Sequence, residues 1–135
     1  MRAQEAPAKQ RESLLREDRL RRRTDYLRCY EQGRRRRGRL VTLFVVEREP
    51  DATGPRLGIT VTRKVGNSVI RHRIKRRVKE IYRRWSQRNQ LPPSDILVHL
   101  RPQAGEADFA TLQKELIRLL SQLTEGNRQE QRAER

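Results

Sequence analysis

The sequence has few of the features that crosslink a chain or anchor it in a membrane. Its 135 residues include one cysteine, Cys29. A disulfide within the chain is therefore excluded, and a zinc site built from thiolates is not expected. No run of about 18 apolar residues is present, which argues against a membrane-spanning helix. Residues 1–13 lack the apolar stretch of a secretory signal, so the cytoplasm is the expected location.

Acidic residues are also scarce. There are 17 Asp and Glu against 33 Lys and Arg, which gives a formal net charge of +16. Of the basic residues, 28 are Arg, whose side chain can hold phosphate with two parallel hydrogen bonds. A biased genome composition would explain why Arg outnumbers Lys, but it would not explain why basic residues outnumber acidic ones. The charge therefore favours a polyanion as partner, with nucleic acid ahead of an anionic membrane surface.

The apolar pattern predicts one α+β domain over residues 21–123. Residues 1–20 are predicted to be a flexible basic arm and residues 124–135 a polar tail. The expected elements are, in order, a helix from its cap Thr24 to Gly33, a basic turn or edge strand over 34–39, strands over 40–46 and 57–62, a helix after Asn67, a strand over 95–101, and a helix from its cap Asp108 to Gly126.

The helix after Asn67 has a narrow apolar stripe and is otherwise basic. The stripe follows steps of four, four, three and four residues, which is typical of one helix face, and consists of Ile70, Ile74, Val78, Ile81 and Trp85. Phe109, on the last helix, is expected in the core like Trp85. Lys79 is expected to point away from the sheet.

Residues 63–77, RKVGNSVIRHRIKRR, form the most basic segment of the chain. A Gly-Asn corner opens the helix, so free backbone N–H groups and the positive helix end are available to a phosphate. Seven Lys and Arg side chains occur in these fifteen residues, without an acidic residue among them. A solvated basic face is the simpler alternative. The mutual repulsion of so many cations favours a bound polyanion instead.

This segment resembles the signature of the bacterial ribonuclease P protein subunit. The shared pattern is a basic pair, Val-Gly-Asn, a small residue, and Arg-x-Arg-x-Lys-Arg on a helix. Two positions depart from the family: His72 stands where Asn is usual, and Arg63 stands where Lys is usual. The resemblance covers about residues 20–123 and includes an aromatic pair before a glycine, here Tyr26 and Tyr30 before Gly33.

The resemblance implies a single-domain αβββαβα sandwich with a left-handed βαβ crossover around the basic helix. It also implies a protein that assists a catalytic RNA in removing the 5′ leader of precursor tRNA, with Mg²⁺ bound mainly by the RNA subunit. The partners would be ribonuclease P RNA and precursor tRNA, with no membrane and no obligate protein partner. By the same resemblance, the residues that contact RNA would be Arg63, Lys64, Asn67, Arg71, Arg73, Lys75, Arg76 and Arg77. The leader cleft would contain Tyr26, Tyr30 and Phe44.

Periodicity alone leaves a core role open for these three aromatic residues, although stacking on unpaired bases suits a site that accepts many leader sequences. His99, in an apolar strand, is expected to be a hydrogen-bonded structural residue. No paired acids, metal-ligand spacing or phosphate loop is visible, so the protein itself is expected to lack catalytic residues. The alternatives are an RNA-binding protein of ribosomal type, a stand-alone nuclease and a DNA-binding regulator.

Overall fold

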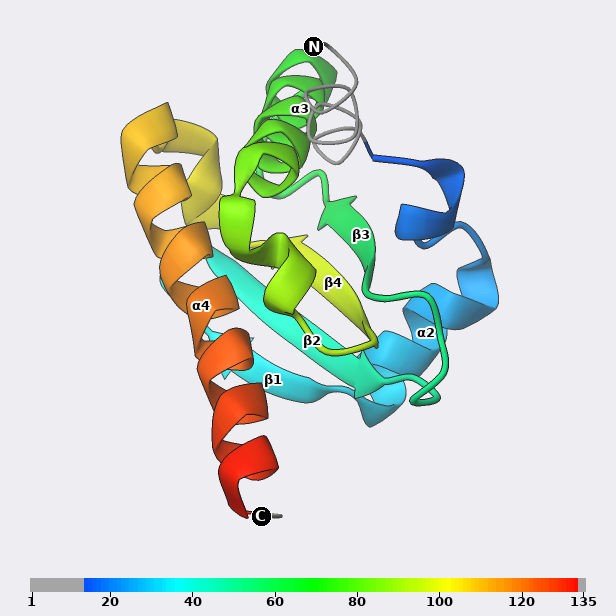
Figure 1. The fold of residues 1–135 in the computed structure, drawn as a ribbon. Helices are drawn as coiled ribbons and strands as arrows, with labels where there is room; N and C mark the ends of the chain where they lie inside the picture. Colours follow the sequence, from blue (N-terminus) through cyan, green and yellow to red (C-terminus); the bar gives the residue numbers. More distant parts are fainter. Residues whose placement is uncertain (1–13, 134–135) are drawn as a thin grey trace, which may run out of the picture.

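The computed structural model describes residues 14–133. A four-stranded sheet lies at its centre, with helices α3 and α4 on one face and helix α2 on the other (Figure 1). This order of elements is the expected αβββαβα sandwich. The helices are α2 (Arg23–Gln32), α3 (Ser68–Arg84) and α4 (Phe109–Ala133), and the strands are β1 (Arg34–Arg37), β2 (Val41–Glu47), β3 (Arg56–Val61) and β4 (Ser94–Leu100).

The strands lie in the order β1-β2-β4-β3. β1 and β4 run antiparallel to β2, whereas β3 and β4 are parallel and are joined through α3. Figure 1 views the sheet from the side of α3 and α4, and β4 lies to the left of the upward-pointing β3. The crossover is therefore left-handed, which is rare because parallel strands are almost always joined in the right-handed sense.

The sheet divides the apolar side chains into two groups, because successive residues of a strand point to opposite faces. The larger cluster lies between the sheet and helices α3 and α4 and contains Leu43, Val45, Ile96 and Val98. The smaller cluster lies under α2 and consists of Leu20, Cys29, Phe44 and Leu97, with Tyr26, Tyr30 and Val46 packed against it. Helix α2 thus covers only part of its face of the sheet.

Residues 14–20, which the sequence assigned to the flexible arm, pack against the edge of the sheet. Arg19 forms a parallel bridge with Leu57 of β3, and the Leu20 N–H donates to the Leu57 carbonyl at 2.9 Å. The side chain of Leu20 is buried. The ordered domain therefore begins before residue 21, and residues 1–13 of the predicted arm lie outside the described residues.

Three further expectations are corrected by the structure. Helix α4 continues through Gly126 to Ala133, so residues 124–133 are helical rather than a tail. Helix α2 is capped at Arg22 without a side-chain hydrogen bond, so Thr24 is not its cap. Phe109 is 36% exposed and lies under the Arg77 guanidinium instead of in the core. Within residues 14–133, no helix combines the length and apolar character that crossing a bilayer requires.

Candidate nucleic-acid interface

Helix α3 carries most of the predicted RNA-binding residues. Asn67 caps the helix as expected, because its side chain accepts a hydrogen bond from the Ile70 N–H at 2.9 Å. The apolar stripe buries Ile74, Val78 and Ile81 against the sheet. This anchoring leaves the remaining faces of the first helical turns to the basic side chains.

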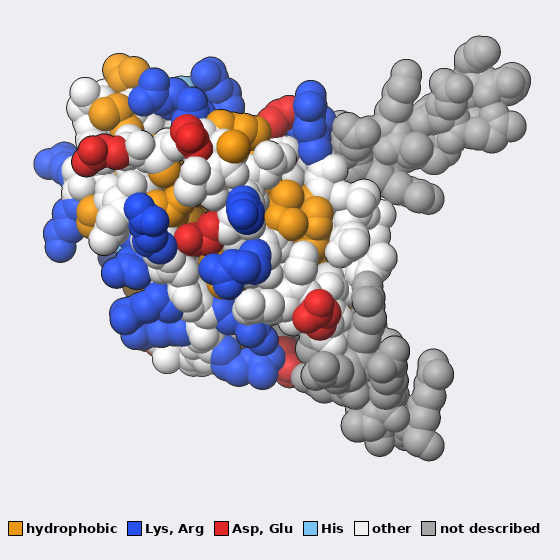
Figure 2. Space-filling model, turned by 90° about the vertical axis from the view of Figure 1, so that its left-hand side faces the viewer, with side chains coloured by type: hydrophobic (Ala, Val, Ile, Leu, Met, Phe, Trp, Pro, Cys, Tyr) orange, Lys and Arg blue, Asp and Glu red, His pale blue; other side chains and the backbone are white. Residues whose placement is uncertain are grey.

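The basic side chains around the start of α3 lie mostly in solvent. Arg71 and Arg77 are half-buried, and the exposed cations are Arg63, Lys64, Arg73, Lys75 and Arg76. In the described part of the chain, no salt bridge neutralises any of these cations. The acidic Glu80 farther along the helix is engaged at 2.7 Å by both Arg83 and Arg84. On the face drawn in Figure 2, blue side chains gather at the lower left, and red ones are interspersed with blue elsewhere.

The predicted aromatic residues lie on the opposite face of the sheet, next to α2. The rings of Tyr30 and Phe44 meet edge to face, with their centroids 4.9 Å apart. Tyr26, one helical turn before Tyr30, contacts the N-terminal segment instead, where its hydroxyl donates to the Leu20 carbonyl at 3.4 Å. Both tyrosines are half-buried, while Phe44 is 7% exposed. The structure therefore pairs Tyr30 with Phe44 and places Tyr26 nearer to β3.

His99 packs beside the rings of Tyr30 and Phe44. Its Nδ1 lies 2.8 Å from the Tyr30 hydroxyl, which bears out the expectation of a hydrogen-bonded residue. Burial lowers the pKa of His99, so the ring is neutral at pH 7. Burial also raises the pKa of Tyr30, and a hydrogen bond with the Thr60 side chain opposes this rise. Tyr30 thus links the sheet to α2 through two polar side chains.

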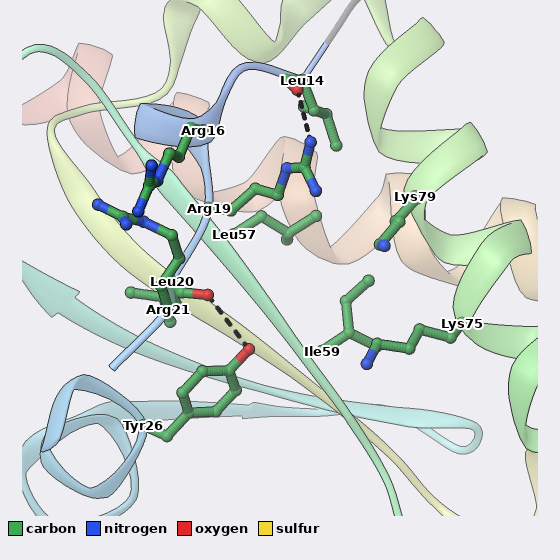
Figure 3. Close-up of a pocket in the computed structure, with 10 residues that line it drawn as sticks. All are labelled: Leu14, Arg16, Arg19, Leu20, Arg21, Tyr26, Leu57, Ile59, Lys75 and Lys79. Atoms are coloured by element: carbon green, nitrogen blue, oxygen red, sulfur yellow. Dashed lines mark hydrogen bonds between the residues drawn. The ribbon is translucent and has the colours of Figure 1, made fainter. Parts of the chain in front are cut away.

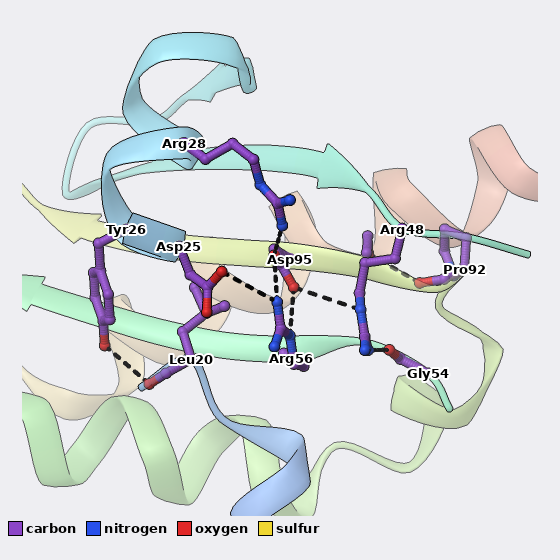
Figure 4. A network of polar contacts seen from close by, with 10 residues as sticks. Leu20, Asp25, Tyr26, Arg28, Arg48, Gly54, Arg56, Pro92 and Asp95 are labelled. Carbon is purple, nitrogen blue, oxygen red and sulfur yellow. Dashed lines mark hydrogen bonds and ion pairs between the residues drawn. The ribbon is translucent and has the colours of Figure 1, made fainter. Parts of the chain in front are cut away.

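A buried carboxylate fixes the position of α2 over the sheet (Figure 4). The Asp95 side chain is fully buried and accepts two hydrogen bonds from Arg56, at 2.7 and 2.8 Å, and one from Arg28 of α2, at 2.5 Å. Arg48 approaches to 3.8 Å. Burial alone would raise the pKa of Asp95, but the hydrogen bonds from Arg56 and Arg28 outweigh it and hold the pKa below its ordinary value.

A pocket of about 430 Å³ separates α3 from the N-terminal segment (Figure 3). Its floor is apolar, and its rim carries five cations: Arg16, Arg19, Arg21, Lys75 and Lys79. Lys79 faces this pocket, contrary to the expectation that it points away. Sequence reasoning also missed Arg16, Arg19 and Arg21, because nothing in the sequence showed that the N-terminal segment runs along β3.

The described residues do not suit a Mg²⁺ site held by protein side chains. Between residues 14 and 133, no group of three or more His, Cys, Asp or Glu side chains comes together. Mg²⁺ requires oxygen ligands, yet the carboxylates of Glu80 and Asp95 are both occupied by arginines.

The left-handed sandwich and its uncompensated cationic helix define a protein of the nucleic-acid-binding class. The family model described as Ribonuclease P matches residues 14–124. The ribonuclease P protein component of Desulfovibrio desulfuricans is 40% identical over 113 residues, which cover 82% of this chain and 85% of that protein. That of Brucella melitensis biotype 1 is 40% identical over 110 residues, covering 76% and 77%.

Solved structures agree with these sequence matches. The RNase P protein of Thermotoga maritima superposes with a TM-score of 0.66 at 32% identity, covering 77% of this chain and 96% of that one. The RNase P protein of Staphylococcus aureus gives 0.69 at 27% identity, covering 77% and 93%. The chain belongs to the family of bacterial ribonuclease P protein components, which act in tRNA 5′ processing together with an RNA subunit.

Proposed function

We propose that helix α3 and its preceding corner bind the RNA subunit of ribonuclease P, and that the cleft beside α2 binds the 5′ leader of precursor tRNA. One observation carries the first part: none of the seven Lys and Arg side chains of residues 63–77 forms a salt bridge with a described residue. Such cations repel one another until a polyanion binds. The N–H groups at the start of α3 add a further site for phosphate.

The cleft supports the second part of the proposal. Tyr30 and Tyr26 are half-buried, which leaves part of each ring available to an unpaired base. Stacking of a base on an aromatic ring contributes about 1–3 kcal/mol and depends little on the base. A cleft of this kind would hold leaders of many sequences in register.

The chemistry of leader removal belongs, in this proposal, to the RNA subunit and its Mg²⁺ ions. The protein would screen the repulsion between two RNAs and would position the leader. The cytoplasm, where precursor tRNA is made, is the proposed location. This division of labour fits the structure, in which the carboxylate of Glu80 on α3 is held by Arg83 and Arg84.

Reconstitution tests the proposal directly. The protein is mixed with a bacterial ribonuclease P RNA and precursor tRNA at low Mg²⁺, and release of the leader is measured. Cleavage that needs both components supports the proposal, whereas an absence of stimulation by the protein contradicts it. Cleavage by the protein alone would indicate a nuclease, and tighter binding to duplex DNA than to the RNA would indicate a DNA-binding regulator.

The role of the cleft is tested by replacing Tyr26 and Tyr30 with Ala. We expect the holoenzyme to lose affinity for precursor tRNA while its affinity for mature tRNA stays the same, because only the precursor has a leader. Leu27 lies on the same helix and is 43% exposed, so Leu27→Ala is the matched control. Equal losses for both tRNAs, or a similar loss with Leu27→Ala, would contradict a leader-binding role.

A further inference from the structure

Strand β1 consists of four consecutive arginines, and the sheet sorts them onto its two faces. Arg34 and Arg36 lie opposite Val45 and Leu43 of β2, whose side chains belong to the α3 and α4 side. Opposed residues of neighbouring strands point to the same face. Arg34 and Arg36 therefore share this side, and both have partners there: Arg34 lies 3.8 Å from Glu47, and Arg36 donates to Gln122 of α4 at 3.2 Å.

The other two arginines point to the face of the cleft. Arg35 lies opposite Phe44, and its guanidinium is 5.4 Å from the centre of the Phe44 ring. Arg37 lies opposite Thr42, which is in turn opposite His99. Arg35 and Arg37 are exposed, and neither forms a salt bridge with any residue that the structure describes.

The cleft face is therefore basic along β1, which is one of the two edge strands of the sheet. Phe44 of the neighbouring β2 packs against Arg35, Tyr30 and His99 and is itself buried. Tyr30 is half-buried, so part of its ring is available to a base. A single strand that stacks a base beside Tyr30 would bring its next phosphates toward Arg35 and Arg37.

We propose that Arg35 and Arg37 bind two phosphates of the single-stranded 5′ leader after it has passed Tyr30 and Phe44. This inference rests on the proposed leader function of the cleft. The contact of Arg35 with Phe44 makes β1 continuous with the aromatic surface, whereas the RNA-binding helix α3 packs on the opposite face. A leader phosphate therefore fits these arginines better than the RNA subunit does.

The alternation of β1 provides a matched pair of variants. R35A/R37A and R34A/R36A remove the same charge from the same strand, but from opposite faces. Each variant is assembled with ribonuclease P RNA, and the affinity for precursor and mature tRNA is measured from 50 to 200 mM salt. Loss of two phosphate contacts to a single strand makes the plot of log association constant against log salt less steep by about 1.4. The ratio of wild-type to R35A/R37A affinity for the precursor should therefore fall about 7-fold from 50 to 200 mM salt.

We expect R35A/R37A to weaken binding of the precursor only, and R34A/R36A to leave the ratio of precursor to mature affinity unchanged. R35K/R37K, which keeps both charges, should retain the wild-type salt slope. The defect should also disappear when the leader is shortened, nucleotide by nucleotide, until it no longer reaches β1. Thermal unfolding of each variant verifies its fold.

Three results would overturn the inference. They are equal effects of the two alanine pairs, an equal loss for precursor and mature tRNA, and an unchanged salt slope for R35A/R37A. If the salt slope of R35A/R37A is unchanged while the wild-type holoenzyme still prefers the precursor, only the proposed role of β1 is wrong. A wild-type holoenzyme that shows no preference for the precursor removes the proposed leader function itself.

Discussion

The substitution Asp95→Asn tests how α2 is held over the sheet. The Asp95 side chain is fully buried and joins Arg28 of α2 to Arg56 of β3. Asn keeps the shape of the side chain, but it removes the charge and points an N–H donor at guanidinium groups that are themselves donors. Removing one partner of a buried ion pair destabilises a protein by about 3–5 kcal/mol.

The lower end of that range applies here. The side chains of Arg28 and Arg56 are 41% and 23% exposed, so water can solvate them after the carboxylate is lost. We therefore expect Asp95→Asn to lower the free energy of unfolding by about 3 kcal/mol at pH 7. For a chain of this length the melting temperature should fall by about 10 °C. Urea unfolding followed by circular dichroism measures the change.

The same experiment has a defined dependence on pH. The pKa of Asp95 is lower in the folded protein than in the unfolded chain, so its contribution to stability is present above the unfolded pKa of about 3.9 and is lost as the pH falls through the folded pKa. The difference in free energy of unfolding between the wild type and Asp95→Asn should stay constant from pH 7 to pH 5 and should become smaller below pH 4. The matched control is Glu47→Gln, since Glu47 is 73% exposed and lies 3.8 Å from Arg34.

We expect Glu47→Gln to have no measurable effect, because exposed ion pairs contribute little. If Asp95→Asn were as stable as the wild type at pH 7, the carboxylate would not anchor α2. If the difference in stability between the wild type and Asp95→Asn were as large at pH 3 as at pH 7, the charge of Asp95 would not be the cause of that difference.

Two further substitutions test the cap of α3 and the contact of α4 with the start of β2. Asn67→Ala should destabilise the protein by about 1 kcal/mol because it removes the cap of α3, and Asn67→Ser should restore most of this loss in thermal unfolding. Glu115→Gln should lower the free energy of unfolding in urea by about 2 kcal/mol, because the carboxylate accepts hydrogen bonds from three backbone N–H groups at the start of β2, at 2.7 to 3.1 Å. The single amide oxygen of Gln can accept only some of these hydrogen bonds. An effect of Glu115→Gln below the error of the measurement would show that water replaces the carboxylate.

The sequence predicted the elements whose signals are local. The stripe of α3, the Asn67 cap and the buried strand β2 all follow from the spacing of apolar residues and from one capping side chain. The handedness of the crossover was available only through the family resemblance, since no periodicity encodes it. The pairing of Tyr30 with Phe44 likewise depended on the register of distant segments.

The clearest error of prediction, at residues 14–20, arose because tertiary contacts outweigh local polarity there. Residues 14–20 look like a solvated arm, yet the β3 edge offers Leu20 a buried site and a backbone partner. Gly126 resembles a helix end, but α4 continues past it. Phe109 has the spacing of a core residue, yet it lies at the first turn of α4, where Arg77 of α3 covers its ring and the sheet does not.

The distribution of ion pairs separates the charges that build the fold from those that are available to RNA. Asp95 and Glu80 are each shared by at least two arginines, and these arginines hold α2 in place or lie along the last turns of α3. Acidic residues are too few to neutralise the rest, because 17 face 33. The surplus gathers where the acids are absent, around the start of α3 and on the cleft face of β1. Further cations line the rim of the pocket beside the N-terminal segment. A protein that needed only solubility could spread this charge evenly, so its concentration on a few surfaces supports the proposed binding of two RNAs.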